Sequence, residues 1–247
     1  MTTGALQLAP LVGQVTIHNR TGPNAPCQAQ EGKVFCFQWA FDTFDRYTTP
    51  FLSQLLLVLV AVAIGFAVAF AFAILSHRQR WLIPTFTGST GVLYTIPSRA
   101  FIFRLRPSTG LGWKTAIIVL SVYTQQIIYR NIVAGLSNVP VESKDAGRGM
   151  GMTDRQLLWR VELPLALPEI IAGLRIATVS TVAISTLMVF ANVNTLGAPL
   201  YQQIDFKTNI VIAAGLSILM AIALDILLLV SQRLLAPWRR PSMGAGV

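Results

Sequence analysis

Few side chains of this sequence are arranged for catalysis. His18 and His77 are the only histidines and stand far apart, so neither a metal-ligand cluster nor a nucleophile–base pair is apparent. Residues 110–115 read GLGWKT and lack the G-x-x-x-x-G-K-[ST] spacing of a phosphate-binding loop. We therefore expect no catalytic residue, no metal site and no cofactor on this chain, and we expect that it is not an enzyme.

Two charged side chains interrupt otherwise apolar stretches. Arg175 lies in the apolar segment 170–191, and Asp225 lies in the apolar segment 210–232. A charge in such a segment is costly in hydrocarbon unless it is paired or reaches an interface. We therefore predict a structural ion pair between Arg175 and Asp225, or pairing of each with a neighbouring terminus.

The most structured polar stretch is the connector of residues 141–169, VESKDAGRGMGMTDRQLLWRVELPLALPE. Pro140 suits the first turn of a helix, which we expect over residues 141–148, with a stop at residues 149–151. Thr153 then offers an N-cap, and Gln156 at the third helical position completes a capping-box pattern.

The second helix of the connector is expected to be amphipathic, with Leu157, Leu158 and Val161 on one face. We expect it to end at Leu163-Pro164, because proline lacks the backbone N–H that a helix requires, and Pro168 to start the next apolar segment. The prediction is two short helices with a glycine hinge, lying along the inner membrane surface. Docking of a partner protein and simple rest on lipid headgroups both fit this pattern.

Composition places these segments in a membrane. The chain has 247 residues, of which 53% are hydrophobic and only 12% charged, with a mean hydropathy of +0.60. The net charge of +9 comes from short basic clusters beside apolar runs, as the positive-inside rule describes, and not from a basic stripe of the kind that binds nucleic acid. We predict a multi-pass protein of the plasma (inner) membrane that contacts lipid and no nucleic acid.

Five segments are candidates to cross the membrane. They are residues 51–75, 82–103, 113–132, 170–191 and 210–232. The fold is therefore expected to be all-α, with about five transmembrane helices. The expected organisation is an extracytoplasmic segment 1–48, a transmembrane domain 49–237 whose cytoplasmic loop covers 137–168, and a cytoplasmic tail 238–247.

Charge and cysteine placement give the expected orientation. If residues 77–80 are cytoplasmic, the inner side carries more Lys and Arg than the outer side, with the N-terminus outside and the C-terminus inside. Cys27 and Cys36 both precede the first apolar segment. A disulfide between them is plausible in an oxidising compartment, and two free thiols are the alternative.

The second apolar segment is interrupted by Pro84, Gly88, Gly91, Pro97 and Arg99. A broken helix that lines a cavity and an ordinary kinked helix both fit. A set of polar and aromatic residues near this interruption is a candidate for a translocation pathway; it comprises Tyr94, Pro97, Ser98, Phe101 and Tyr123, with Tyr129 as a further aromatic residue. Their rings suit cation–π contact with a quaternary ammonium group, although packing between helices explains the same residues.

The connector resembles the "EAA" loop of ABC-importer permeases, whose pattern is E-A-A, three residues, G, nine residues and I-x-L-P. Asp145-Ala146-Gly147 stands for E-A-A, Gly151 for the glycine, and Val161 with Leu163-Pro164 for the close. The departures are Asp for Glu, Gly for the second Ala and Val for Ile; Gly147 is expected to weaken its helix by roughly 1 kcal/mol relative to alanine.

Residues 51–237 are similar to the osmoprotectant branch of these permeases, which handles glycine betaine, carnitine, choline and proline betaine. The similarity is carried by the segments 95–100, 129–131, 146–152, 161–168 and 172–177. The chain departs from the branch at Tyr94, where glutamine is usual, and at residues 191–197, where a glycine-rich segment is usual.

The resemblance implies a type I ABC-importer permease that works as a homo- or heterodimer. It implies docking of a separate ATPase, which binds ATP and Mg, on the connector, and delivery of solute by an extracytoplasmic substrate-binding protein. The residues it assigns to docking are Asp145, Ala146, Gly147, Gly151, Leu157, Leu158, Val161, Leu163 and Pro164. A permease for amino acids such as methionine is the alternative within this class; an ATP-independent secondary transporter and a membrane scaffold are the alternatives outside it.

Overall fold

A computed structural model describes residues 41, 44–79, 81–202 and 207–235 of the chain. Within these residues all the regular elements are helices. The cysteines Cys27 and Cys36, most of the expected segment 1–48 and the expected tail 238–247 lie outside the described residues.

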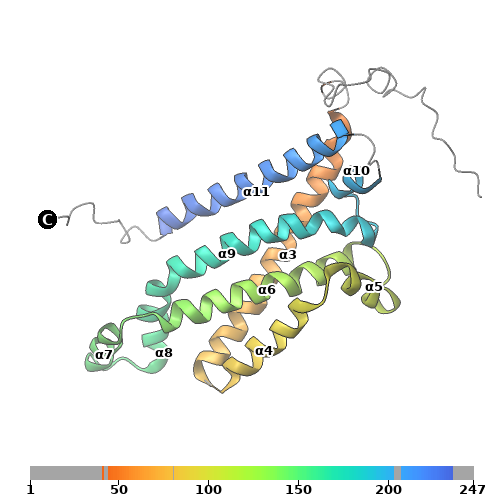
Figure 1. Cartoon of the computed structure of the whole chain (residues 1–247). Helices are drawn as coiled ribbons and strands as arrows, with labels where there is room; N and C mark the ends of the chain where they lie inside the picture. The colour runs from red at the N-terminus through yellow and green to blue at the C-terminus, as the bar shows by residue number, and fades with distance from the viewer. Residues whose placement is uncertain (1–40, 42–43, 80, 203–206, 236–247) are drawn as a thin grey trace, which may run out of the picture.

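Four long helices dominate the fold (Figure 1). They are α3 (Asp45–Arg78), α6 (Trp113–Ser137), α9 (Leu163–Ser185) and α11 (Lys207–Leu235). Shorter elements join them: α4 (Leu82–Thr95), α5 (Ser98–Thr109), α7 (Val141–Gly149), α8 (Asp154–Leu157), the π-helical turn η1 (Leu158–Glu162), the 3-10 helix η2 (Thr186–Ala191) and α10 (Gly197–Gln202).

Buried clusters fix the directions of the long helices. Ala61 of α3 shares one cluster with Leu120 of α6, and Ala73 of α3 shares another with Ile132 of α6. Since both pairs advance in the same sense along the chain, α3 and α6 run parallel. Ile170 at the start of α9 joins the second cluster, so α9 runs antiparallel to them.

The second expected span, residues 82–103, is not a single helix. It is divided between α4 and α5, because Pro97 has no N–H to donate and adopts an extended ψ of 133° before Ser98 starts the next helix. The 14 residues of α4 cover about 21 Å, less than a hydrocarbon core of about 30 Å. The parallel course of α3 and α6 nevertheless requires α4 and α5 together to carry the chain back between the two ends of the bundle (Figure 1).

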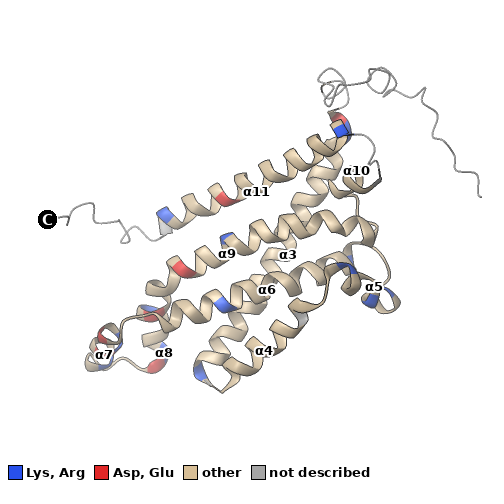
Figure 2. Cartoon of the chain, viewed as in Figure 1, with Lys and Arg blue, Asp and Glu red and all other residues tan. Residues whose placement is uncertain are grey.

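Four helical segments are long and apolar enough to cross a membrane. Among the described residues they are Asp45–Arg78, Trp113–Ser137, Asp154–Ala191 and Lys207–Leu234. Large apolar side chains on their outer faces are exposed; the exposed fraction is 62% for Leu52, 62% for Leu219 and 60% for Leu227. Charged residues instead gather at the α7–α8 end and around α5 (Figure 2). This distribution is that of a multi-pass membrane protein.

Polar side chains also join the helices inside the bundle. Gln54 of α3 is fully buried; its Oε1 accepts a hydrogen bond from Leu196 N (3.0 Å), and its Nε2 donates to Val182 O (3.4 Å). Thr124 and Thr181 pair their hydroxyls at 2.8 Å between α6 and α9. Such bonds between helices stabilise packing where no water competes.

Candidate functional site

The connector between α6 and α9 lies at one end of the bundle, opposite α5 and α10 (Figure 1). Its first helix, α7, ends at Gly149, close to the predicted residue 148. Gly151 follows with φ +77°, a left-handed conformation that L side chains rarely adopt. The glycine of the loop pattern is therefore required by the turn itself.

The predicted capping box starts the second helix. Thr153 N donates to Gln156 Oε1 (2.9 Å), and Gln156 N donates to Thr153 Oγ1 (3.4 Å). These reciprocal bonds satisfy two backbone N–H groups that a helix start leaves free. They fix the direction in which the chain leaves the Gly151 turn.

The predicted end of this helix at Leu163-Pro164 is wrong. The chain continues without a break from α8 through η1 into α9, and Pro168 lies inside α9 instead of starting it. Leu163 N donates to Leu158 O, five residues back, so the turn before Pro164 is π-helical and wider than an α-turn. This widening relieves the clash that the ring of Pro164 would cause in a regular helix. The second half of the connector is therefore not a separate helix, because it joins a membrane helix through the π-turn.

The two faces of this segment differ as predicted. Leu157 and Leu158 are 2% and 5% exposed; Leu158 joins the buried cluster of the bundle, Leu157 packs against Gly147 of α7, and Val161 is partly buried. Arg155, Trp159 and Arg160 are exposed. The leucines therefore anchor the connector, and the outward face offers the cationic and aromatic side chains.

Gly147 is the point at which α7 crosses the second helix. A Cβ on this residue would lie 2.6 Å from Leu157 Cδ1 and 3.7 Å from Val161 Cγ2. Glycine at position 147, where the loop pattern has alanine, weakens α7 but thus permits the two halves of the connector to approach each other. Asp145, in the same helix, is exposed and lies 3.7 Å from Arg148 Nη1, an exposed pairing that contributes little stability.

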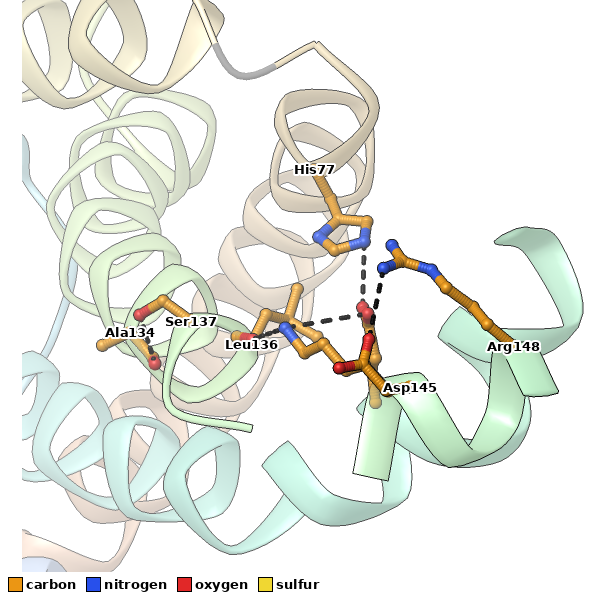
Figure 3. Close-up of polar contacts among 8 residues, drawn as sticks. His77, Ala134, Leu136, Ser137, Asp145 and Arg148 are labelled. Atoms are coloured by element: carbon orange, nitrogen blue, oxygen red, sulfur yellow. Dashed lines mark hydrogen bonds and ion pairs between the residues drawn. The ribbon is translucent and has the colours of Figure 1, made fainter. Parts of the chain in front are cut away.

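A buried acid joins three elements at this end (Figure 3). Glu162 of η1 is 4% exposed; its Oε2 lies 2.9 Å from His77 Nε2 of α3, and its Oε1 lies 3.7 Å from Lys144 Nζ of α7. Lys144 also donates to Leu136 O of α6 at 3.3 Å. Among the described residues Glu162 Oε2 makes no hydrogen bond, so its approach to His77 Nε2 is a close polar contact and not an aligned hydrogen bond.

A cavity of about 920 Å³ opens beside this cluster. Its lining includes the cationic Arg78, Arg148 and Arg155 together with the Trp159 ring and the Glu162 carboxylate. The connector end therefore presents a recess with a largely basic wall.

Arg175 and Asp225 meet between α9 and α11. Arg175 Nε donates to Asp225 Oδ1 at 2.8 Å, and Nη2 donates to Oδ2 at 2.7 Å. This bidentate geometry neutralises both charges within the apolar part of the two helices.

The candidate pathway residues lie at the opposite end of the molecule from the connector, with one exception. Tyr123 packs its ring at 5.4 Å from Tyr94 and 6.3 Å from Phe101, and its hydroxyl donates to Ile96 O at the α4–α5 break. Pro97 and Ser98 form that break. Tyr129 is separate, since its hydroxyl pairs with Ser76 near the connector end at 3.0 Å.

Comparison of the chain with known families decides its class. Residues 46–241 match the family described as "Binding-protein-dependent transport system inner membrane component". The chain belongs to this family.

Curated relatives of this family member are permeases. The choline transport system permease protein OpuBD of Bacillus subtilis is 35% identical over 159 residues, 63% of this chain and 70% of that protein. The osmoprotectant import permease protein OsmW of Salmonella typhimurium is 35% identical over 171 residues, 66% of this chain and 80% of that protein. The glycine betaine/carnitine/choline permease OpuCD of Bacillus subtilis is 34% identical over 170 residues, 68% of this chain and 74% of that protein.

Solved structures establish the fold of this family member. A chain of the MetNI methionine ABC transporter aligns with a TM-score of 0.65 and 21% identity, covering 78% of this chain and 96% of that one. A chain of an amino acid ABC transporter aligns with a TM-score of 0.65 and 19% identity, covering 78% and 97%. The fold is that of type I ABC-importer permeases.

Two clusters in this family member were not predicted from the sequence. The first is Glu162 with His77 and Lys144; the second is Arg99, whose guanidinium lies over the rings of Phe190 and Tyr201. Their members are far apart along the chain and share no periodic pattern. The one local signal for the second cluster was Arg99, two residues after Pro97 in the interrupted apolar segment 82–103.

Proposed function

We propose that this chain is the transmembrane permease subunit of an ATP-driven ABC importer of osmoprotectants, with glycine betaine, choline, carnitine and proline betaine as cargo. The curated relatives named above support the cargo class. The ATPase activity, with its ATP and Mg, belongs to a partner subunit that docks on the connector. A second permease chain and an extracytoplasmic substrate-binding protein complete the importer.

The observation that carries the proposal is the continuous helix from Asp154 through α9. A partner that moves the exposed face of Arg155, Trp159 and Arg160 acts directly on the membrane helix, because the helical backbone runs without a break from α8 through the π-turn η1 into α9. Gly147 and Glu162 hold the rest of the connector to the same unit. We assign this end to the cytoplasm and the α5–α10 end to the outer side, in line with the bias of Lys and Arg.

Uptake tests the cargo. The chain is produced together with its ATPase and binding-protein partners in a host that lacks its own osmoprotectant importers. Labelled glycine betaine, choline and carnitine should accumulate in an ATP-dependent manner, and labelled methionine should not. Methionine uptake without uptake of any quaternary ammonium compound would contradict the cargo assignment.

Co-purification tests the docking. The wild-type chain should retain a nucleotide-hydrolysing partner through detergent extraction. Gly151→Val forces a β-branched residue into φ +77° and should release that partner. Gly149→Ala is the matched control, because Gly149 ends a regular helix and a Cβ there meets nothing within 4 Å. Equal retention by both variants would argue against the connector as the docking element.

A further inference from the structure

Arg99 occupies an aromatic pair at the end of the molecule opposite the connector. Its Cζ lies 4.0 Å from the centroid of the Phe190 ring and 5.4 Å from the centroid of the Tyr201 ring. The two rings are 5.1 Å apart with planes inclined at 57°. The inclined rings of Phe190 and Tyr201 therefore form a V-shaped pair, called the V below, and the Arg99 guanidinium lies against both rings.

The three residues come from three separate segments of the chain. Arg99 is in the first turn of α5, Phe190 is in η2 and Tyr201 is in α10. Arg99 is exposed and Tyr201 is 37% exposed. Solutes that reach this end of the molecule can therefore reach the V.

No described carboxylate neutralises Arg99. The ion pairs in the described part of the chain involve His77, Lys144, Arg148 and Arg175 as cations. Among the described residues only ring faces hold the guanidinium, an attraction of modest size at an exposed site. A side chain held in this way exchanges readily with another cation.

We propose that Phe190 and Tyr201 form a binding site for the quaternary ammonium group of the cargo, and that Arg99 fills this site until cargo displaces it. The cargo class rests on the proposed function; the site itself rests on the ring geometry. Guanidinium and trimethylammonium are both weakly hydrated, delocalised cations that bind aromatic faces well. A site that accepts one is suited to the other.

Displacement has a structural consequence beside the site. Arg99 lies two residues after Pro97, at the break between α4 and α5. When cargo takes the V, the Arg99 side chain loses its contact with the rings of η2 and α10, while Phe101 and Ile102 keep α5 packed on η2. Occupation by Arg99 also weakens the apparent affinity, since cargo binds only the fraction of molecules in which the V is empty. If Arg99 fills the V nine-tenths of the time, the weakening is about tenfold.

Direct binding tests the site. The full-length chain in lipid nanodiscs is titrated with choline and with tetramethylammonium, followed by saturation-transfer NMR. The negative probe is the neutral isostere of choline in which carbon replaces the quaternary nitrogen. Arg99→Ala should bind both cations up to about tenfold more tightly than wild type. Phe190→Leu and Tyr201→Leu, each made in the Arg99→Ala background, should lose roughly two- to fivefold per ring.

Arg104→Ala is the matched control, because Arg104 is an exposed arginine of the same helix. It should bind like wild type. Thermal unfolding of each variant checks that the bundle is intact. Weaker or unchanged binding by Arg99→Ala, or equal binding of the neutral isostere, would overturn the proposal.

The outcome is separable from that of the proposed function. Suppose that the wild-type chain takes up quaternary ammonium compounds but that the Phe190 and Tyr201 variants bind choline as tightly as their parent. The importer assignment would then stand, and the proposed site would be wrong. Conversely, tetramethylammonium binding that follows the expected order of variants supports the site even if the transported cargo proves to be another cation.

Discussion

His77 Nε2 lies 2.9 Å from Glu162 Oε2, which ties the last turns of α3 to the π-helical turn that precedes α9. The same carboxylate lies 3.7 Å from Lys144 Nζ of α7. One buried acid thus connects the first membrane helix with both halves of the connector. We expect a force applied to the connector to be transmitted through this contact as well as along the helix.

Replacing the buried acid should uncouple the connector from α3. Glu162→Ala removes the shared partner of His77 and Lys144, and we expect the free energy of unfolding to fall by about 1–3 kcal/mol, as for polar groups left without their partner. Uptake should fall more than the amount of inserted protein. Thermal unfolding and uptake per inserted chain are the measurements. Glu142→Gln, which changes an exposed acid of α7, is the control and should change neither thermal unfolding nor uptake. If the Glu162 and Glu142 variants behaved alike, Glu162 would only fill space.

Gly147 and Leu157 should be energetically coupled. Gly147→Ala places a Cβ 2.6 Å from Leu157 Cδ1, and the overpacking of about 1–3 kcal/mol should exceed the gain in helix propensity of about 1 kcal/mol. Leu157→Ala removes the obstructing atoms, so the double variant should lose less stability than the sum of the two single variants. A double-mutant cycle on unfolding free energies measures this coupling. Additive losses would mean that Leu157 can swing away at no cost.

Local chemistry made part of the site predictable. The Thr153–Gln156 capping box and the inward face of Leu157 and Leu158 follow from spacing within one turn or two, and the structure has both. The break at Pro97 likewise follows from a missing N–H. The helix end predicted at Pro164 was wrong, because the π-helical turn before Pro164 makes room for the proline ring and lets the helix continue.

Contacts between distant segments could not be predicted in the same way. His77 meets Glu162 across 85 positions, and Arg99 meets Phe190 across 91, by subtraction of the residue numbers. Each contact depends on how elements far apart in the chain cross, and the sequence of each element alone does not give that crossing. The Arg175–Asp225 pair was predictable only because a charge in hydrocarbon has so few stable arrangements.

Reversing both charges of the Arg175–Asp225 pair should restore the stability that either single reversal removes. Arg175→Asp and Asp225→Arg each leave two like charges between α9 and α11, and each should lower the yield of folded permease. The double reversal should recover part of the stability, with a coupling energy of at least about 1 kcal/mol. Thermal unfolding in detergent is the readout. Arg233→Asp, an exposed site at the end of α11, is the control for charge reversal. Absence of any recovery would count against direct pairing.

The hydroxyl of Tyr123 should hold the break between α4 and α5 closed. It donates to Ile96 O, a carbonyl that the end of α4 leaves without a helical partner. Tyr123→Phe keeps the ring contacts with Tyr94 and Phe101 but leaves this carbonyl unpaired, at a cost of about 1–3 kcal/mol. We expect faster amide hydrogen exchange through the first turn of α5, with little change in α6. Tyr94→Phe is the matched control, because Tyr94 packs on the same ring, is 43% exposed, and has no hydrogen bond from its hydroxyl among the described residues. Equal protection of α5 in the two variants would show that Pro97 alone sets the break, without help from Tyr123.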